Sequence, residues 1–218
     1  MRRLKATIVI FFVSLSLYSA PSELYLGGNF FGGMDFLTQS TGKRFPTMIK
    51  GNATSYVSSM TRFGLGVEMT YFPYSPLKLG ISAGYQVLMP VGYCLTDSLS
   101  EVAGDDVAYI NYSFLGRHDI SLALSYFWMI GQEFGMYFDA GGTVSIHTIP
   151  DRNDKNSRLD VNYSSFTELG TYADAGLLLF HGNSYYKIGA RALLLFPEPT
   201  PDISVAITFS GGFLFSFS

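Results

Sequence analysis

An alternation of large apolar residues with small or polar ones runs through most of this chain and limits what it can fold into. In the closing segment, Ile203–Ser218, the odd positions are mostly large and apolar, and the even positions are mostly small or polar. A period of two is the repeat of a β-strand whose two faces meet different surroundings. Helical periodicity appears in no segment after residue 22. The alternation predicts eight strands, at residues 24–36, 63–72, 77–89, 119–128, 134–148, 168–179, 186–196 and 203–218.

The composition is unusual for a chain of strands that folds in water. Charged residues make up 14% and aromatic residues 16% of the 218 residues, which is too apolar for a disordered chain and poor in charge for a soluble surface. No uninterrupted apolar run approaches the roughly 20 residues that a membrane helix needs. The apolar residues are therefore spread over many short segments, and their arrangement decides the class.

Residues 1–22 have the three parts of a secretory signal peptide. A basic start is followed by an apolar stretch, residues 6–17, and then by small residues, and the apolar stretch is too short to span a membrane. We expect cleavage between Ser19 and Ser22, which leaves residues 23–218 as one mature domain. An uncleaved N-terminal anchor is the alternative.

Loss of residues 1–22 removes three basic side chains, so that 11 of the 14 basic residues remain against all 17 acidic ones. An acidic, exported chain argues against a nucleic-acid partner. Cys94 is the only cysteine, so it has no partner for an internal disulfide and is interpreted as a lone thiol in a loop.

The connections between the predicted strands alternate in length. Short ones, residues 72–76, 129–134 and 181–184, alternate with longer ones, residues 37–62, 90–116, 150–166 and 197–202. Short turns on one rim and longer loops on the other are typical of a transmembrane up-and-down antiparallel β-barrel with periplasmic turns and extracellular loops. Aromatic residues also gather beside the short turns, as they do at membrane interfaces. A secreted soluble β-sandwich is the alternative.

The polar face of the predicted strands carries charged residues of both signs. In an eight-stranded barrel this face points inward, and the interior is just wide enough for side chains to fill. Glycine recurs on the same face, as a narrow interior requires. Because unpaired buried charges are costly, we expect these residues to form pairs. The predicted lumen charges are Asp35, Glu68, Lys78, Arg117, Asp119, Asp139, Glu168, Asp174, Lys187 and Arg191.

The end of the chain carries a short motif. The stretch "SGGFLFSF", residues 210–217, resembles the C-terminal signal of bacterial outer-membrane proteins, with Ser210, Gly212, Phe215 and Phe217 at its positions. The resemblance implies an outer-membrane location and recognition of this strand by the barrel-assembly machinery. The additional Ser218 departs from the family pattern, which typically ends on the aromatic residue.

The size and layout of the mature chain resemble the small eight-stranded barrels of the OmpW, OmpX and OmpA membrane-domain type, and OmpW is preferred. Resemblance to OmpW implies a narrow passage for small hydrophobic molecules. Resemblance to OmpX would instead imply adhesion or host-factor binding through the extracellular loops. The loop at residues 37–62 suits the second reading, because it combines basic and apolar side chains. These are Lys43, Arg44, Phe45, Met48 and Lys50.

Candidate catalytic residues do not combine into a site. Alternation places His118 on the lipid side, whereas Asp119 and Ser121 point inward. His147 shares a face with Ser145, but the sequence identifies no acid partner for it, and a nucleophile needs both a base and an orienting group. We therefore predict a non-enzymatic protein that binds no metal or cofactor and contacts outer-membrane lipid. The stretch Val107–Leu115 continues the alternation of the neighbouring strand, which it extends above the membrane in one interpretation.

Overall fold

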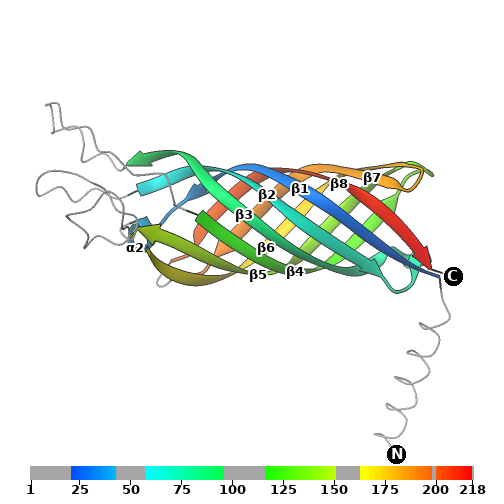
Figure 1. Cartoon of the computed structure of the whole chain (residues 1–218), viewed down its shortest axis with the longest axis horizontal. Helices are drawn as coiled ribbons and strands as arrows, with labels where there is room; N and C mark the ends of the chain where they lie inside the picture. Colours follow the sequence, from blue (N-terminus) through cyan, green and yellow to red (C-terminus); the bar gives the residue numbers. More distant parts are fainter. Residues whose placement is uncertain (1–20, 43–56, 96–115, 151–162, 198–199, 218) are drawn as a thin grey trace, which may run out of the picture.

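The computed structural model describes residues 21–42, 57–95, 116–150, 163–197 and 200–217. Eight antiparallel strands close into a barrel in chain order, which confirms the predicted fold class (Figure 1). Among the described residues, no helix is long and apolar enough to cross a membrane. The strands are β1 Ser22–Phe36, β2 Val57–Phe72, β3 Leu79–Leu95, β4 Gly116–Met129, β5 Phe134–Pro150, β6 Tyr163–His181, β7 Ser184–Leu195 and β8 Asp202–Phe217.

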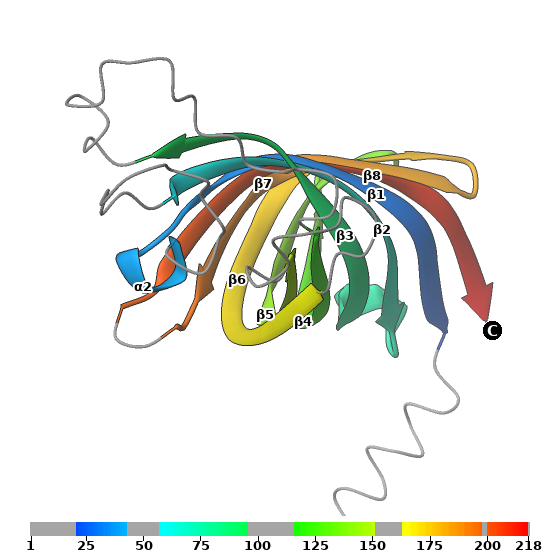
Figure 2. The ribbon, with the colours of Figure 1, turned by 60° about the vertical axis from the view of Figure 1, so that its left-hand side comes forward.

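The barrel is closed by pairing of the first strand with the last. Their register runs from Ser22 opposite Phe217 to Phe36 opposite Ile203, without a shift. The C-terminus therefore returns to the rim where β1 begins, as an even number of strands requires. The three short turns lie on this same rim, and the strand ends beside the long connections lie on the other (Figures 1 and 2). By the usual arrangement of such barrels, the short-turn rim is periplasmic.

Strand ends differ from the predicted ones mainly at the rim with the long connections. There β2 begins at Val57 and β6 at Tyr163, and β3 continues to Leu95, each five or six residues beyond the predicted end. Cys94 therefore lies on β3, and the prediction that it lies in a loop is wrong. These extensions are poorer in large apolar residues than the membrane-facing parts, so the alternation that predicts a strand is weak there. The predicted strand extension at residues 107–115 lies outside the described residues, as does the predicted signal peptide up to residue 20.

The short turn between β2 and β3 contains the 3₁₀ helix η1, Ser75–Leu77. The prediction that Lys78 lies on a strand is wrong, because Lys78 follows this helix in the left-handed conformation with φ of 47°. The ring of Pro76 fixes its own φ angle, which favours a turn at this position. A second short element, α2 Gln39–Gly42, follows β1 at the opposite end of the barrel (Figure 2).

Candidate functional site

The interior of the barrel is the candidate site, because the strands direct their polar and charged side chains into it. Nine of the ten predicted lumen charges lie within strands on the inward-facing positions, and seven of these nine are at most 7% exposed. These seven are Asp35, Arg117, Asp119, Asp139, Glu168, Asp174 and Lys187. The side chain of Glu68 is 12% exposed. Arg191, the ninth, has a side chain 13% exposed.

An aromatic layer fills the periplasmic end of this interior. The ring of Tyr25 lies 5.3 Å from that of Phe72, 5.2 Å from that of Phe127 and 5.4 Å from that of Tyr185, centroid to centroid and edge to face. Such aromatic pairs are favourable beyond the area that they bury. Tyr137 and Leu178 complete the cluster, and all six side chains are buried. Six buried side chains therefore pack against one another at the end of the interior that faces the periplasm.

A layer of ion pairs lies above the aromatic one. The Lys187 ammonium is 2.9 Å from a Glu68 carboxylate oxygen, and it also lies over the ring of Tyr137 at 5.0 Å from the centroid. The Arg191 guanidinium pairs with Asp174 at 2.9 Å, and the Tyr137 hydroxyl donates to the same carboxylate at 2.8 Å. Buried charges are tolerated only when they are paired and hydrogen-bonded in this way. The Lys187–Glu68 pair crosses the lumen from β7 to β2, whereas the bonds to Asp174 join neighbouring strands.

Asp139 belongs to the same layer but takes hydrogen bonds from a neighbouring strand. Its carboxylate accepts from the Ser125 hydroxyl and lies 3.9 Å from the Lys187 ammonium. Ser125 also shares a hydrogen bond with Ser82, which in turn bonds Thr70 at 2.6 Å. A row of hydroxyl groups on β4, β3 and β2 thus extends along the wall from the Asp139 carboxylate on β5.

A second group of ion pairs fills the interior toward the extracellular end. Arg117 lies between two carboxylates, at 2.9 Å from Asp35 and 3.0 Å from Asp119. Arg62 also pairs with Asp35, and the Ser145 hydroxyl donates to Asp119 at 2.7 Å. All four charged residues are at most 5% exposed. One cavity beside this network has a volume of about 20 Å³, which is room for about one water molecule.

Two members of the ion pairs were missed by reasoning from the sequence. Arg62 was assigned to the end of a loop, although its even number continues the inward-facing positions Gly64, Gly66 and Glu68, and this parity was the available signal. Glu23 precedes the first predicted strand and pairs with Lys78 at the periplasmic rim. No spacing rule in the sequence connects two residues so far apart.

The histidines occupy two different environments. His118 lies outside the barrel, where its Nδ1 is 2.8 Å from the Tyr85 hydroxyl. The expectation that His147 lacks an acid partner is wrong, because its Nε2 lies 3.1 Å from a Glu168 oxygen on the adjacent strand. The Ser145 hydroxyl donates to Asp119 instead. His147 is only 1% exposed, so a substrate has no access to this pair, and the absence of enzymatic activity stays a prediction.

No metal site is visible among the described residues, since no three His, Cys, Asp or Glu side chains gather there in a way that could hold an ion. Absence of a bound cofactor remains a prediction from the sequence.

The outer surface of the barrel is apolar over its whole circumference. Leu122 is 61% exposed on β4, Val67 is 60% exposed on β2, and Phe209 is 47% exposed on β8. Exposed aromatic residues lie near the short turns, among them Tyr71, Tyr126, Trp128, Tyr186, Phe215 and Phe217. A closed barrel with an apolar outer band and aromatic residues at its rim satisfies every backbone group internally and spans a lipid bilayer.

The structure therefore defines a transmembrane β-barrel of the small outer-membrane type, which is the predicted class. Neither the models of protein families nor the curated protein sequences contain a match to this chain.

Solved structures do contain the same fold. Neisserial surface protein A aligns over 88% of this chain and 97% of its own, with a TM-score of 0.58 and 11% identity. The N-terminal β-barrel domain of Pseudomonas aeruginosa OprF aligns over 89% and 97%, with a TM-score of 0.43 and 14% identity. Ail of Yersinia pestis aligns over 89% and 99%, with a TM-score of 0.47 and 9% identity. The likeness to the neisserial protein is one of fold alone, and a closed barrel with an apolar outer band is the fold that crosses outer membranes.

Proposed function

We propose that the barrel is a closed membrane anchor and that the protein acts as a surface binding protein through its extracellular segments. The observation that carries this proposal is the filled interior. Aromatic rings occupy its periplasmic end, and two groups of ion pairs occupy the rest. A solute that passed along the barrel axis would have to separate charges that are buried and paired, which is strongly unfavourable.

A passage for small hydrophobic molecules, the preferred reading of the sequence, remains the second hypothesis. The charged interior disfavours an apolar solute along the axis, because such a solute would replace partners of the buried ion pairs. Uptake of an apolar solute into vesicles that contain the folded protein distinguishes the two hypotheses. Uptake above that of protein-free vesicles would favour the passage.

The extracellular segments differ in charge, and this difference suggests the kind of partner. Residues 43–56 contain three basic residues and no acidic one, whereas residues 96–115 contain four acidic residues and no basic one. Residues 151–162 contain three residues of each sign. Exposed loops carry function more often than the scaffold that holds them. We propose that the basic segment contacts a negatively charged partner at the cell surface.

Binding of the polyanion dextran sulfate, with neutral dextran as reference, tests this proposal on cells or on nanodiscs. Replacement of Lys43, Arg44 and Lys50 by glutamine should abolish the binding, and added salt should weaken it by screening. The matched control removes the same charge from another loop, through replacement of Arg152, Lys155 and Arg158 by glutamine, and should keep the binding. Equal loss in both variants, or no preference for the charged polymer, would refute the basic segment as the contact.

We propose further that β8 is the signal read by the barrel-assembly machinery. Its motif residues alternate as the signal requires, with Phe215 and Phe217 exposed on the lipid side at 46% and 52%. Replacement of both by alanine should leave the protein unassembled in the periplasm, as judged by gel mobility before and after boiling. Phe213→Ala is the control, because Phe213 is 61% exposed on the same face of β8 but lies outside the motif. Normal assembly of the double variant would exclude this role.

A further inference from the structure

The glycines of this barrel fall into two sets according to what surrounds them. A side-chain carbon at Gly141, Gly176 or Gly212, which face inward, would lie 2.0 to 2.1 Å from a backbone oxygen of the neighbouring strand. No real side chain tolerates such a distance. Glycine is therefore required at these positions by the crowded interior.

The outward-facing glycines Gly28 and Gly211 are not required in this way. The nearest atom to a side-chain carbon at Gly28 would be the Gly66 carbonyl oxygen at 3.8 Å, and at Gly211 it would be a Tyr186 ring carbon at 3.4 Å. Both distances are ordinary contacts, so the barrel itself has room for side chains here. Because glycine weakens a strand and leaves it without packing, its presence at both positions is not explained by the folding of the barrel.

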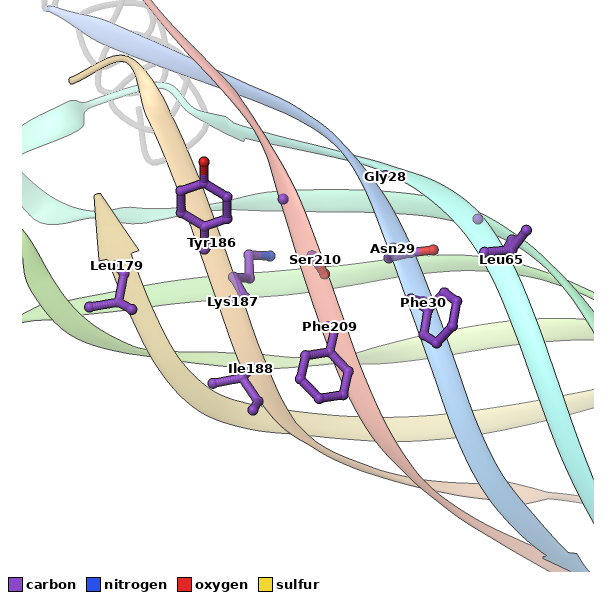
Figure 3. Close-up of a pocket in the computed structure, with 12 residues that line it drawn as sticks. Gly28, Asn29, Phe30, Leu65, Leu179, Tyr186, Lys187, Ile188, Phe209 and Ser210 are labelled. Atoms are coloured by element: carbon purple, nitrogen blue, oxygen red, sulfur yellow. The ribbon is translucent and has the colours of Figure 1, made fainter. Parts of the chain in front are cut away.

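Gly28 and Gly211 lie directly opposite one another on β1 and β8 and form the floor of a groove. On the extracellular side the groove is bounded by Phe30 and Phe209, which are also a cross-strand pair (Figure 3). Leu179 on β6 and Leu65 on β2 lie at its two ends, and Tyr186 on β7 lies between them. We call this depression, with a volume of about 740 Å³, the glycine groove.

The groove is part of the surface that faces lipid, so its occupant comes from the membrane. Its large apolar side chains all belong to the exposed apolar belt, with Phe30 42% and Tyr186 55% exposed. From β6 to β2 it crosses five adjacent strands, which is about 19 Å at about 4.8 Å per strand. One leaflet contributes about 15 Å of hydrocarbon to the membrane core. The groove is therefore long enough to hold one acyl chain.

Position along the barrel indicates which leaflet supplies the chain. Gly211 is six residues from Phe217 at the periplasmic end of β8, which corresponds to about 15 Å along the membrane normal for a strand with a rise of about 3.3 Å and a tilt of about 40°. Gly211 also pairs with Tyr186, which is two residues from the start of β7 at the short turn. The groove floor therefore lies in the periplasmic half of the bilayer, where the amphipathic ring of Tyr186 suits the nearby interface.

We propose that the glycine groove binds one acyl chain of a phospholipid from the periplasmic leaflet and retains that lipid longer than the surrounding ones. The aromatic pair Phe30 and Phe209 packs against the chain, and the two glycines let it approach the backbone. The same principle lets small residues bring packed surfaces close together inside membranes, where dispersion contacts rather than the hydrophobic effect drive association.

Native mass spectrometry of the full chain, released from nanodiscs of palmitoyl-oleoyl phosphatidylethanolamine and phosphatidylglycerol, tests this proposal. The unmodified protein should retain one phospholipid through a detergent wash, and the variant with Gly28→Leu and Gly211→Leu should retain none. Gly142→Leu is the matched control, because Gly142 also faces outward, with its nearest atom at 3.8 Å, but lies on β5. This control should retain the lipid, and equal retention by all three proteins would overturn the proposal.

Two further outcomes would also overturn it. Retention of lipopolysaccharide in place of phospholipid, when both are supplied, would assign the groove to the other leaflet. A change from dimer to monomer in the double leucine variant, with phospholipid retention unchanged, would make the groove an interface between two copies of the barrel.

A reporter variant keeps the proposal testable if the double leucine variant does not fold. With Trp128→Phe and Tyr186→Trp, the only tryptophan lies at the groove. Phospholipid brominated on its acyl chains should quench this tryptophan at a lower fraction of brominated lipid than it quenches Trp128 of the unmodified protein. Equal quenching curves would overturn the proposal, because they would show ordinary exchanging lipid at both positions.

Discussion

Neighbouring residues on the same strand of this barrel face opposite surroundings, one the packed interior and the other lipid. On β4, Ser121 is 7% exposed in the interior and donates a hydrogen bond to the Gly84 carbonyl oxygen, whereas Leu122 is 61% exposed on the lipid side. The inner face holds paired charges, hydroxyl groups and glycines under tight steric limits. The outer face holds large apolar residues with free space around them. A soluble protein reverses this arrangement, and the comparison shows that the solvent of each face, rather than strand propensity, selects its residues.

The largest expected difference between the two faces concerns one pair of adjacent glycines. Gly141→Leu should abolish assembly, because its side chain would begin 2.0 Å from the Leu122 carbonyl oxygen, whereas Gly142→Leu should assemble normally. The measurement is the shift in gel mobility between unboiled and boiled samples. Assembly of both variants would show that the interior is less crowded than described.

Removal of one buried charge should have the next largest effect. Arg117→Met leaves Asp35 and Asp119 without their shared partner, and loss of one member of a buried pair costs about 3–5 kcal/mol. Urea unfolding in lipid vesicles, followed by Trp128 fluorescence, measures the free energy. A variant that also carries Asp119→Asn should recover part of the loss, because Asp35 keeps Arg62 as its partner. No recovery would argue that Arg117 acts through its packing alone.

On the outer face, a charged side chain should destabilise the barrel more, the deeper it lies in the bilayer. Leu122 lies in the middle of β4, and arginine at the bilayer midplane of such barrels costs about 2–4 kcal/mol. Leu79, at the periplasmic end of β3, serves as the control, since the cost near the interface falls to about 0–1 kcal/mol. Equal destabilisation by Leu122→Arg and Leu79→Arg would contradict the assigned depth.

The smallest effect is expected at the rim, where the two faces meet water. Lys78 pairs with Glu23, but the lysine side chain is 22% exposed, and ion pairs open to solvent contribute about 0–1 kcal/mol. Lys78→Met should therefore leave the urea midpoint nearly unchanged. A loss as large as that of Arg117→Met would mean that this pair is as buried as those of the interior.

The sequence predicts the membrane-crossing parts of this fold well, because both faces of each strand are under strong selection by their surroundings. The alternation on β8 identifies a strand, and its outward phenylalanines indicate lipid. Strand ends beyond the membrane are predicted poorly, as at Val57 and Leu95, since both faces meet water there and the contrast between them disappears.

The sequence predicts which residues face the interior, but it does not predict which of them form pairs. Parity alone assigns Asp174 and Arg191 to the lumen, and they are also cross-strand neighbours. The bond from Tyr185 to Glu68 spans 117 residues of sequence, and it depends on barrel closure, which alternation does not specify. The aromatic layer around Tyr25 was missed because the aromatic residues beside the short turns were all interpreted as membrane-interface residues. Phe72, Phe127 and Tyr185 are instead buried inside the barrel.

Planar-bilayer recording of the folded, heat-modifiable protein tests the central claim, that paired charges and aromatic rings close the barrel, most directly. Insertion of a conducting porin under the same conditions confirms that the assay detects pores. We predict that this protein inserts without raising the membrane conductance above the baseline. Stable, repeated conductance steps from the folded protein, absent after boiling, would contradict the claim and would restore a passage along the axis of the barrel.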